Sequence, residues 1–226
     1  MNAATERLLL AGPAGKIDVA LDRPAGAPVG VALVAHPHPL HGGTRDNKVV
    51  QTLARALVQL GFVCWRPNFR GVEGSEGSHD EGIGETDDML ALLEHARAHD
   101  SLQGLAQAPV ALAGFSFGCF VQTRVAARLL ARGEAQPRMA LVGPAASRFA
   151  LEPVPADTLV VHGEVDDVVP LGAALDWARP QDLPVVVVPG ADHFFHRRLP
   201  LLKRLVLRWM ADAASGPAKP SDYNPD

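Results

Sequence analysis

Short apolar runs alternate along the chain with longer segments in which apolar residues recur every three or four positions. The continuous run VGVALVA at residues 29–35 is typical of a strand that is buried on both faces. Val49, Leu53 and Leu57 have the spacing that places them on one face of a helix. The predicted strands span residues 7–10, 16–21, 29–35, 62–65, 110–113, 139–142, 158–161 and 185–188. The predicted helices span residues 48–60, 86–99, 118–131, 171–178 and 200–213.

The order of these elements predicts the fold class. Gly12 and Pro13 separate the first two strands, which indicates an antiparallel hairpin. The later strands alternate with helices, which favours a mostly parallel sheet covered by helices on both faces. In such α/β sheets the functional side chains gather at the carboxyl ends of the strands.

Composition agrees with a single globular domain over residues 1–214. The chain has 226 residues, of which 47% are hydrophobic and 20% are charged. Residues 215–226, SGPAKPSDYNPD, contain three prolines and no aliphatic anchor, which predicts a flexible tail. Lys and Arg total 21 against 25 Asp and Glu, so the net charge of −4 disfavours nucleic acid as a partner.

The sequence also bears on the cellular location of the protein. No apolar run approaches the ~18 residues of a membrane span. The four apolar residues at 8–11 fall short of the ~7–15 of a secretory signal core. Cys64 and Cys119 lie in neither a CxxC nor a metal-ligand spacing. We therefore expect no membrane association, no disulfide framework and a cytoplasmic location.

The sequence GFSFG at residues 114–118 carries the strongest chemical signal. It directly follows the predicted strand 110–113 and directly precedes a predicted helix, which is the context that the G-x-S-x-G nucleophile elbow requires. A turn this tight needs small residues beside its strained centre. It would raise the Ser116 hydroxyl above the sheet and aim the Phe117 N–H at an oxyanion. The alternative role for Ser116 is to cap the next helix.

A serine nucleophile needs a general base. In proteins with this type of elbow, the chain order is serine, then acid, then histidine. Three histidines follow Ser116, namely His162, His193 and His196. His193 lies on the loop after the last strand, where it can reach over Ser116. His162, at a strand end, is expected to be structural, and His196 to be a surface residue.

The acid is expected on the loop after the strand 158–161. Residues 143–151 contain no Asp or Glu, whereas residues 162–170 contain three acidic side chains. Spacing alone leaves Asp166 and Asp167 open as partners of the base. Asp192 is a poor candidate because side chains of adjacent residues diverge.

A second backbone donor for the oxyanion is expected from the loop HPHPLHGG at residues 36–43. Pro37 and Pro39 have no N–H. His38 and Leu40 remain, with His38 favoured by its position two residues into the loop and Leu40 still open.

The same loop raises the alternative of a metal site. His36, His38 and His41 are its histidines, but no carboxylate or Cys lies close by in sequence and the spacing is unusual for ligands. We therefore expect neither a metal nor a cofactor.

With these motifs the chain resembles the α/β-hydrolase superfamily from about residue 32 to residue 210. It is most similar to a compact, lidless bacterial subgroup of serine hydrolases related to dienelactone hydrolases and small carboxylesterases. Dienelactone hydrolases proper carry Cys at the elbow, where this chain has Ser116. The motifs that carry the resemblance are HPHPL at 36–40, NFRG at 68–71, GFSFG at 114–118, HGEVD at 162–166 and GADH at 190–193.

The resemblance implies a catalytic triad in which Asp166, rather than Asp167, is the acid. Ser116 would attack a carbonyl carbon and form an acyl-enzyme. His193 would move the proton, and Asp166 would orient and stabilise the imidazole. The N–H groups of Phe117 and His38 would bind the oxyanion.

The expected substrate is a small carboxylic ester. About 15 residues, 143–157, separate two strands where many relatives insert a lid, which predicts an open, shallow site. Arg70 is a candidate for binding a substrate carboxylate, or else pairs with an acid of its own loop. Phe115 and Phe194 are candidates for apolar walls. Thioester or amide hydrolysis, acyl transfer, and a binding role without catalysis are alternatives; the oligomeric state is not predicted.

Overall fold

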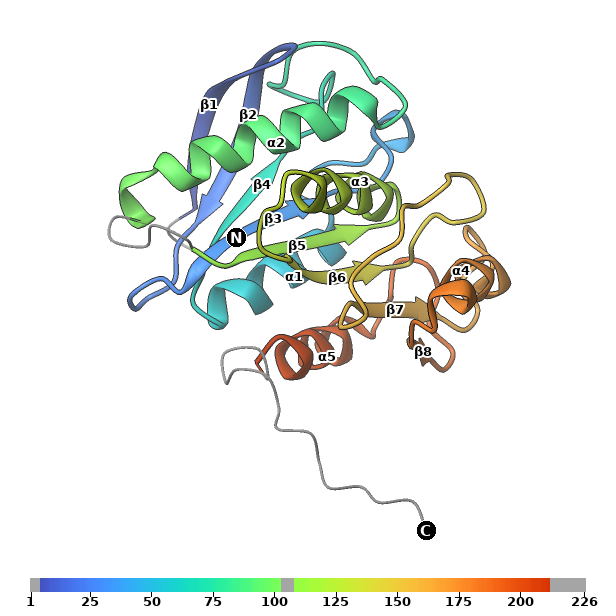
Figure 1. The fold of residues 1–226 in the computed structure, drawn as a ribbon. Helices are drawn as coiled ribbons and strands as arrows, with labels where there is room; N and C mark the ends of the chain where they lie inside the picture. The colour runs from blue at the N-terminus through green and yellow to red at the C-terminus, as the bar shows by residue number, and fades with distance from the viewer. Residues whose placement is uncertain (1–4, 103–107, 212–226) are drawn as a thin grey trace.

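The computed structural model describes residues 5–102 and 108–211 (Figure 1). The predicted tail at 215–226, the domain limit at residue 214 and the last two residues of the predicted helix 200–213 lie outside the described residues. Thr5 is the first described residue, just before the first strand.

The architecture is one eight-stranded sheet with the strand order β1-β2-β4-β3-β5-β6-β7-β8. β1 and β2 form the predicted antiparallel hairpin, and β2 also pairs antiparallel with β4. All pairs from β4 to β8 are parallel, which confirms the predicted mostly parallel sheet. The strands are β1 (Glu6–Gly12), β2 (Gly15–Asp22), β3 (Gly30–Ala35), β4 (Phe62–Pro67), β5 (Val110–Phe115), β6 (Arg138–Val142), β7 (Leu159–Gly163) and β8 (Val185–Val188).

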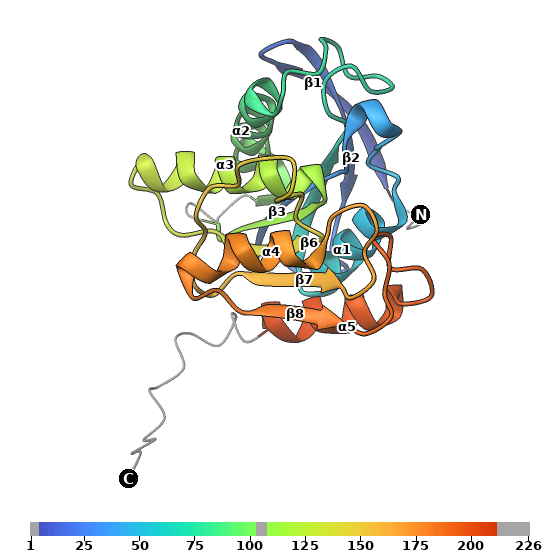
Figure 2. The same cartoon turned by 90° about the vertical axis from the view of Figure 1, so that its right-hand side faces the viewer.

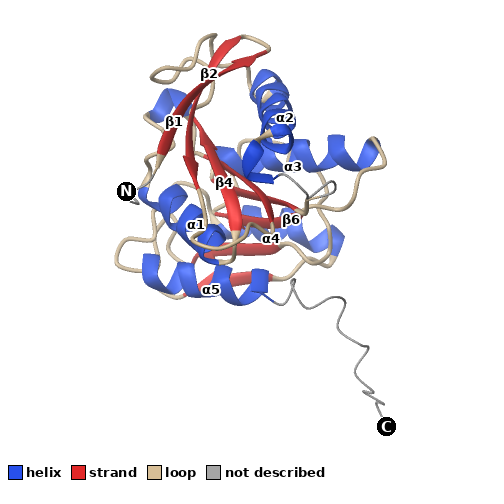
Figure 3. Cartoon of the chain, turned by 90° about the vertical axis from the view of Figure 1, so that its left-hand side faces the viewer, coloured by secondary structure: helices blue, strands red, loops and turns tan. Residues whose placement is uncertain are grey.

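Helices cover both faces of the sheet. α2, α3 and α4 lie on one face (Figures 1 and 2), and α1 and α5 lie side by side on the other (Figure 3). Within residues 5–102 and 108–211, no helix is both long enough and apolar enough to cross a bilayer. The helices are α1 (Lys48–Gln59), α2 (Ile83–Ala98), α3 (Phe117–Ala131), α4 (Leu171–Ala178) and α5 (Leu199–Ala211), with 3₁₀ turns η1 (Pro39–His41), η2 (Asp100–Leu102) and η3 (Arg179–Gln181).

The strand β3 shows why the central apolar runs are continuous. Val31 and Leu33 belong to the core under α2 and α3, whereas Ala32 and Val34 belong to the core under α1 and α5. Successive side chains of a strand point to opposite faces, so a strand covered on both faces has no polar position. Packing on both faces holds each strand in place in the sheet. It thereby positions the loops that follow the carboxyl ends of the strands.

The largest boundary difference is at α2, which begins at Ile83, three residues before the predicted start at residue 86. The Glu85 carboxylate accepts hydrogen bonds from the N–H groups of Asp80 and Gly82 at 2.9 and 2.8 Å. Gly82 adopts a φ of 84°, which suits glycine. This acidic side chain at the helix N-terminus stabilises the extra turn, which the glycine-rich sequence concealed.

Candidate active site

Ser116 occupies the sharp turn between β5 and α3. Its backbone has φ 56° and ψ −117°, a strained conformation for a residue with a side chain. A Cβ at Gly114 would lie 2.6 Å from the Gly118 oxygen, and one at Gly118 would lie 2.4 Å from the Ala35 oxygen. The turn therefore needs glycine at both positions. Ser116 makes no side-chain cap to α3, so helix capping does not explain it.

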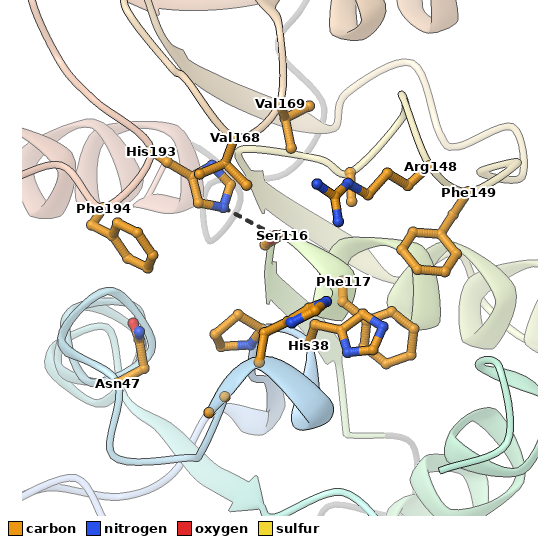
Figure 4. A pocket seen from close by; sticks show the side chains of 15 residues that line it. His38, Asn47, Ser116, Phe117, Arg148, Phe149, Val168, Val169, His193 and Phe194 are labelled. Carbon is orange, nitrogen blue, oxygen red and sulfur yellow. Dashed lines mark hydrogen bonds between the residues drawn. The ribbon is translucent and has the colours of Figure 1, made fainter.

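Three side chains from three loops form a continuous hydrogen-bonded chain. The imidazole of His193 lies with Nε2 3.0 Å from the Ser116 Oγ (Figure 4) and with Nδ1 2.7 Å from the Asp166 Oδ2. His193 follows β8 and is 2% exposed, and Asp166 follows β7. The carboxyl ends of parallel strands thus bring together side chains that are 27 and 77 residues apart.

The environment of Asp166 keeps its carboxylate ionised. Burial alone raises the pKa of Asp166, but hydrogen bonds from His193 and from the N–H groups of Val169 and Val168 outweigh it, so the pKa lies below its ordinary value. An ionised carboxylate only accepts, so His193 donates its Nδ1 proton to Asp166. His193 Nε2 is then free to accept the Ser116 hydroxyl proton.

The structure separates Asp166 from the other acidic and histidine candidates. Asp167 is exposed, and no ion pair joins it to a histidine among the described residues. His162 is buried and donates from Nε2 to the Val169 oxygen at 2.9 Å, and its pKa is lowered because burial disfavours its charged form. Asp192 instead pairs with the exposed His196 at 2.6 Å.

A cavity of about 320 Å³ opens at Ser116, and it distinguishes the two oxyanion candidates of the histidine loop. His38 and Phe117 line this cavity (Figure 4). The N–H of Phe117 lies in the first turn of α3, where helical N–H groups have no intrahelical acceptor. Leu40 is 70% exposed, does not line the cavity, and donates its N–H to the His38 Nδ1 at 3.3 Å. The placement thus favours His38 over Leu40.

The remaining histidine of that loop has a structural position. His36 is fully buried, donates from Nδ1 to the Pro37 oxygen and accepts from the Phe69 N–H at Nε2. Burial lowers its pKa to about 3, so the ring is neutral. Both ring nitrogens are occupied, which leaves His36 unable to join His38 and His41 around an ion. In the described part of the chain, no group of three or more His, Cys, Asp and Glu side chains is arranged to hold a metal.

The structure corrects the prediction that Arg70 contacts substrate. Arg70 does not line the cavity, and its guanidinium donates two hydrogen bonds of 2.8 Å to the Asp88 carboxylate and one to the Gly84 oxygen. The alternative of an internal ion pair therefore describes Arg70. Its partners are Asp88 on α2 and, at 3.7 Å, Asp80 of its own loop.

Removal of Arg70 is expected to destabilise the fold. Its side chain is 11% exposed and that of Asp88 is 8% exposed, so Arg70→Met would leave a largely buried acid without its partner. We expect the free energy of unfolding in urea to fall by ~2–4 kcal/mol, with KM for an ester changed less than about twofold. Arg179→Met is the matched control, because the Arg179–Asp176 pair is exposed and worth at most ~1 kcal/mol. Equal stability losses in the two variants would contradict this assignment.

The two predicted apolar contacts have different positions. Phe194 lines the cavity and is 42% exposed, in agreement with a wall (Figure 4). Phe115 is fully buried, does not line the cavity, and packs its ring 4.9 Å from the His193 ring. Phe115 therefore supports the imidazole from the core side, and its prediction as a substrate contact is corrected.

Several lining residues are absent from the sequence-based prediction. Arg148 and Phe149 come from the connection between β6 and β7, Asn47 precedes α1, and Val168 and Val169 follow Asp166. In the sequence, the only indication that these residues line a site is that they follow the carboxyl ends of strands. That position does not indicate the direction in which a side chain points.

Comparisons with known proteins agree with this geometry. Residues 15–147 match the X-Pro dipeptidyl-peptidase (S15) family, a span that contains Ser116 and ends before Asp166 and His193. An uncharacterized protein of Rickettsia prowazekii is 32% identical over 196 residues, which are 81% of this chain and 79% of that protein.

Solved structures extend the similarity over the whole fold. A serine hydrolase without a lid from Xanthomonas campestris has 37% identity and a TM-score of 0.83, covering 97% of this chain and 99% of that one. A serine hydrolase homologue from Coxiella burnetii has 39% identity and a TM-score of 0.76, covering 90% and 96%. A dienelactone hydrolase from Anabaena variabilis, at 18% identity and a TM-score of 0.72 over 92% and 97%, shares the fold. The chain therefore belongs to the X-Pro dipeptidyl-peptidase (S15) family and, within the α/β-hydrolase superfamily, to the compact serine hydrolases without a lid.

Proposed function

We propose that the protein hydrolyses small carboxylic esters through an acyl-enzyme on Ser116. The observation that carries the proposal is the hydrogen-bonded chain from Ser116 through His193 to Asp166, with contacts of 3.0 and 2.7 Å at the floor of an accessible cavity. This is the arrangement of nucleophile, base and orienting acid that acyl transfer needs.

In the proposed mechanism, the Ser116 Oγ attacks the ester carbonyl carbon while His193 Nε2 accepts the hydroxyl proton. The tetrahedral oxyanion accepts hydrogen bonds from the backbone N–H groups of Phe117 and His38. It collapses as the bond to the alcohol oxygen breaks, and His193 protonates that oxygen. Water then attacks the acyl-enzyme by the same route, with Asp166 stabilising the imidazolium in both halves.

The size of the cavity favours short acyl groups. At about 320 Å³ it lies near the lower end of small-molecule sites, and residues 143–158 contain no helix or strand that would form an apolar cover. Phe149, Phe194 and Val168 supply apolar wall area. A long acyl chain would leave most of its length in water.

A peptidase is the second candidate, and the family match favours it. A dipeptidyl substrate presents a positively charged amino terminus, which is normally met by a carboxylate. Among the residues that the structure describes, no Asp or Glu lines the cavity. This absence of an acidic group leads us to place esters ahead of amino-terminal dipeptides.

Hydrolysis of p-nitrophenyl esters from acetyl to palmitoyl, beside glycyl-proline p-nitroanilide, tests the proposal. We expect kcat/KM to be highest for acetyl to butyryl and to fall steadily with longer chains. A preference for palmitoyl would contradict the small, uncovered site. Cleavage of the anilide alone would establish the peptidase.

The oxyanion assignment can be tested at a backbone atom. His38 has φ −53°, which proline tolerates, so His38→Pro removes the N–H with little backbone strain. His38→Ala removes the same ring but keeps the N–H and is the matched control. We expect kcat for p-nitrophenyl acetate to be ~10²–10³-fold lower in His38→Pro than in His38→Ala. Equal rates in the two variants would assign the second donor to another residue.

A further inference from the structure

The cavity lining carries the positive charge of Arg148 in a chain that is acidic overall. Its fifteen lining residues include Arg148 and the histidines His38, His41 and His193, and no Asp or Glu among the described residues joins them. The whole chain carries a formal net charge of −4. The positive character is therefore local to the site and matches a negatively charged ligand.

Arg148 is the arginine of the cavity lining, and the described part of the chain gives it no acidic partner. It is exposed, and within the described ranges no carboxylate lies within 4.0 Å of its guanidinium. Arg45, Arg66 and Arg70 all have acidic partners by the same distance criterion. A guanidinium that points into a cavity and forms no ion pair with the described residues is available to bind a substrate.

A cluster of histidine rings lies near Arg148. The His38 ring lies 4.6 Å from the His41 ring and 4.8 Å from the His79 ring. The pKa of His38 is lowered by burial first and by the neighbouring His79, His41 and Arg148, while the Glu81 carboxylate opposes them. Two acidic groups lie at this cluster, Glu81 near His38 and Glu85, whose carboxylate is 2.9 Å from His79 Nδ1, and neither lines the cavity.

The position of Arg148 relative to the triad indicates which half of the substrate it meets. Arg148 and Phe149 lie on the opposite side of Ser116 from Phe194, and His193 lies on the Phe194 side (Figure 4). In the proposed mechanism His193 protonates the leaving alcohol, so the alcohol lies toward His193 and Phe194. The acyl group of the substrate then lies on the side of Arg148, over the Phe149 ring.

We propose that Arg148 binds a carboxylate at the far end of the acyl group, so that the preferred substrates are half-esters of short dicarboxylic acids. This inference rests on the proposed ester hydrolysis. The planar guanidinium presents two parallel N–H donors, which match the two oxygens of a carboxylate. Arg148 is thus a specificity-determining residue, and it takes no part in the proton transfers.

Kinetics on two matched esters test the inference. The probes are mono-p-nitrophenyl glutarate, which bears a free carboxylate, and its neutral methyl ester, which has the same acyl chain. We expect wild type to prefer the anionic ester. In Arg148→Met, the ratio of kcat/KM for the anionic ester to that for the neutral one should fall ~10–100-fold, mainly through KM. Arg148→Lys should retain part of the preference, and Arg179→Met, altered at an exposed arginine outside the cavity, should keep all of it.

The failures of the two proposals are distinguishable. Ser116-dependent hydrolysis of both esters with an unchanged ratio in Arg148→Met would overturn the role of Arg148 and leave the ester hydrolase intact. Without hydrolysis of either ester, binding of monomethyl glutarate to the protein is measured by titration calorimetry. Binding that is lost in Arg148→Met would support the anion site on its own, and absence of binding to wild type would overturn it.

Discussion

Ser116→Ala is expected to lower kcat for p-nitrophenyl acetate by at least ~10⁴-fold. The variant removes the Oγ that lies 3.0 Å from His193 Nε2, while the cavity and the N–H groups of Phe117 and His38 stay in place. Any residual rate would come from oxyanion binding and from water. Steady-state hydrolysis corrected for spontaneous hydrolysis measures the loss.

The fold should tolerate this change. Alanine and serine both carry a Cβ, so the strain at φ 56° is similar in the two proteins and the melting temperature should shift by only a few degrees. Ser147→Ala is the matched control, since Ser147 is exposed and lies on the connection that carries Arg148. Retention of more than about one per cent of wild-type kcat by Ser116→Ala would point to another nucleophile.

Asp166→Asn is expected to lower kcat by ~10³–10⁴-fold. The Asp166 carboxylate accepts from His193 Nδ1 through Oδ2 and from the N–H groups of Val168 and Val169 through Oδ1. An asparagine would keep its oxygen on the two N–H groups and turn its NH₂ toward His193. The imidazole would then carry its proton on Nε2, which could no longer accept the Ser116 proton.

Asp167→Asn removes the same charge one residue away. Asp167 is exposed, so we expect this variant to keep kcat within about twofold of wild type. Comparison of the two variants thus separates the effect on kcat of orienting His193 from the effect of removing a negative charge from the loop. A comparable loss in both variants, measured at saturating p-nitrophenyl acetate, would contradict the assignment of Asp166 as the orienting acid.

The fold and the centre of the site were predictable because the signals are local. Continuous apolar runs such as VGVALVA indicate doubly covered strands, and β3 has that environment. The GFSFG turn is constrained by its own sterics, since Gly114 and Gly118 have no room for a side chain. His193 followed from its place after the last strand, β8, because parallel strands end at one edge.

The choice between neighbouring residues was not predictable from spacing. Asp166 and Asp167 both follow β7, and the family resemblance, rather than the pattern, favoured Asp166. In the structure the N–H groups of Val168 and Val169 hold the Asp166 carboxylate toward His193, whereas Asp167 projects to solvent. The loop backbone makes this choice, and no periodicity describes it.

The substrate contacts were the least predictable part. Arg70 lies in a motif of the resemblance, yet the carboxylate that accepts its hydrogen bonds, that of Asp88, is 18 residues away on α2. Arg148 lies on an irregular connection without a motif, and only the folded chain turns it into the cavity. Side-chain direction in loops depends on tertiary contacts, which one sequence does not reveal.

The most direct test of the central claim is the mass-spectrometric location of the adduct formed with diisopropyl fluorophosphate. The reagent phosphorylates a serine that a nearby base has activated, and fluoride leaves. We predict one diisopropylphosphoryl group per chain, located on Ser116 by peptide mapping and absent from Ser116→Ala. An adduct on a different residue, or an unmodified chain that still hydrolyses p-nitrophenyl acetate, would contradict the account.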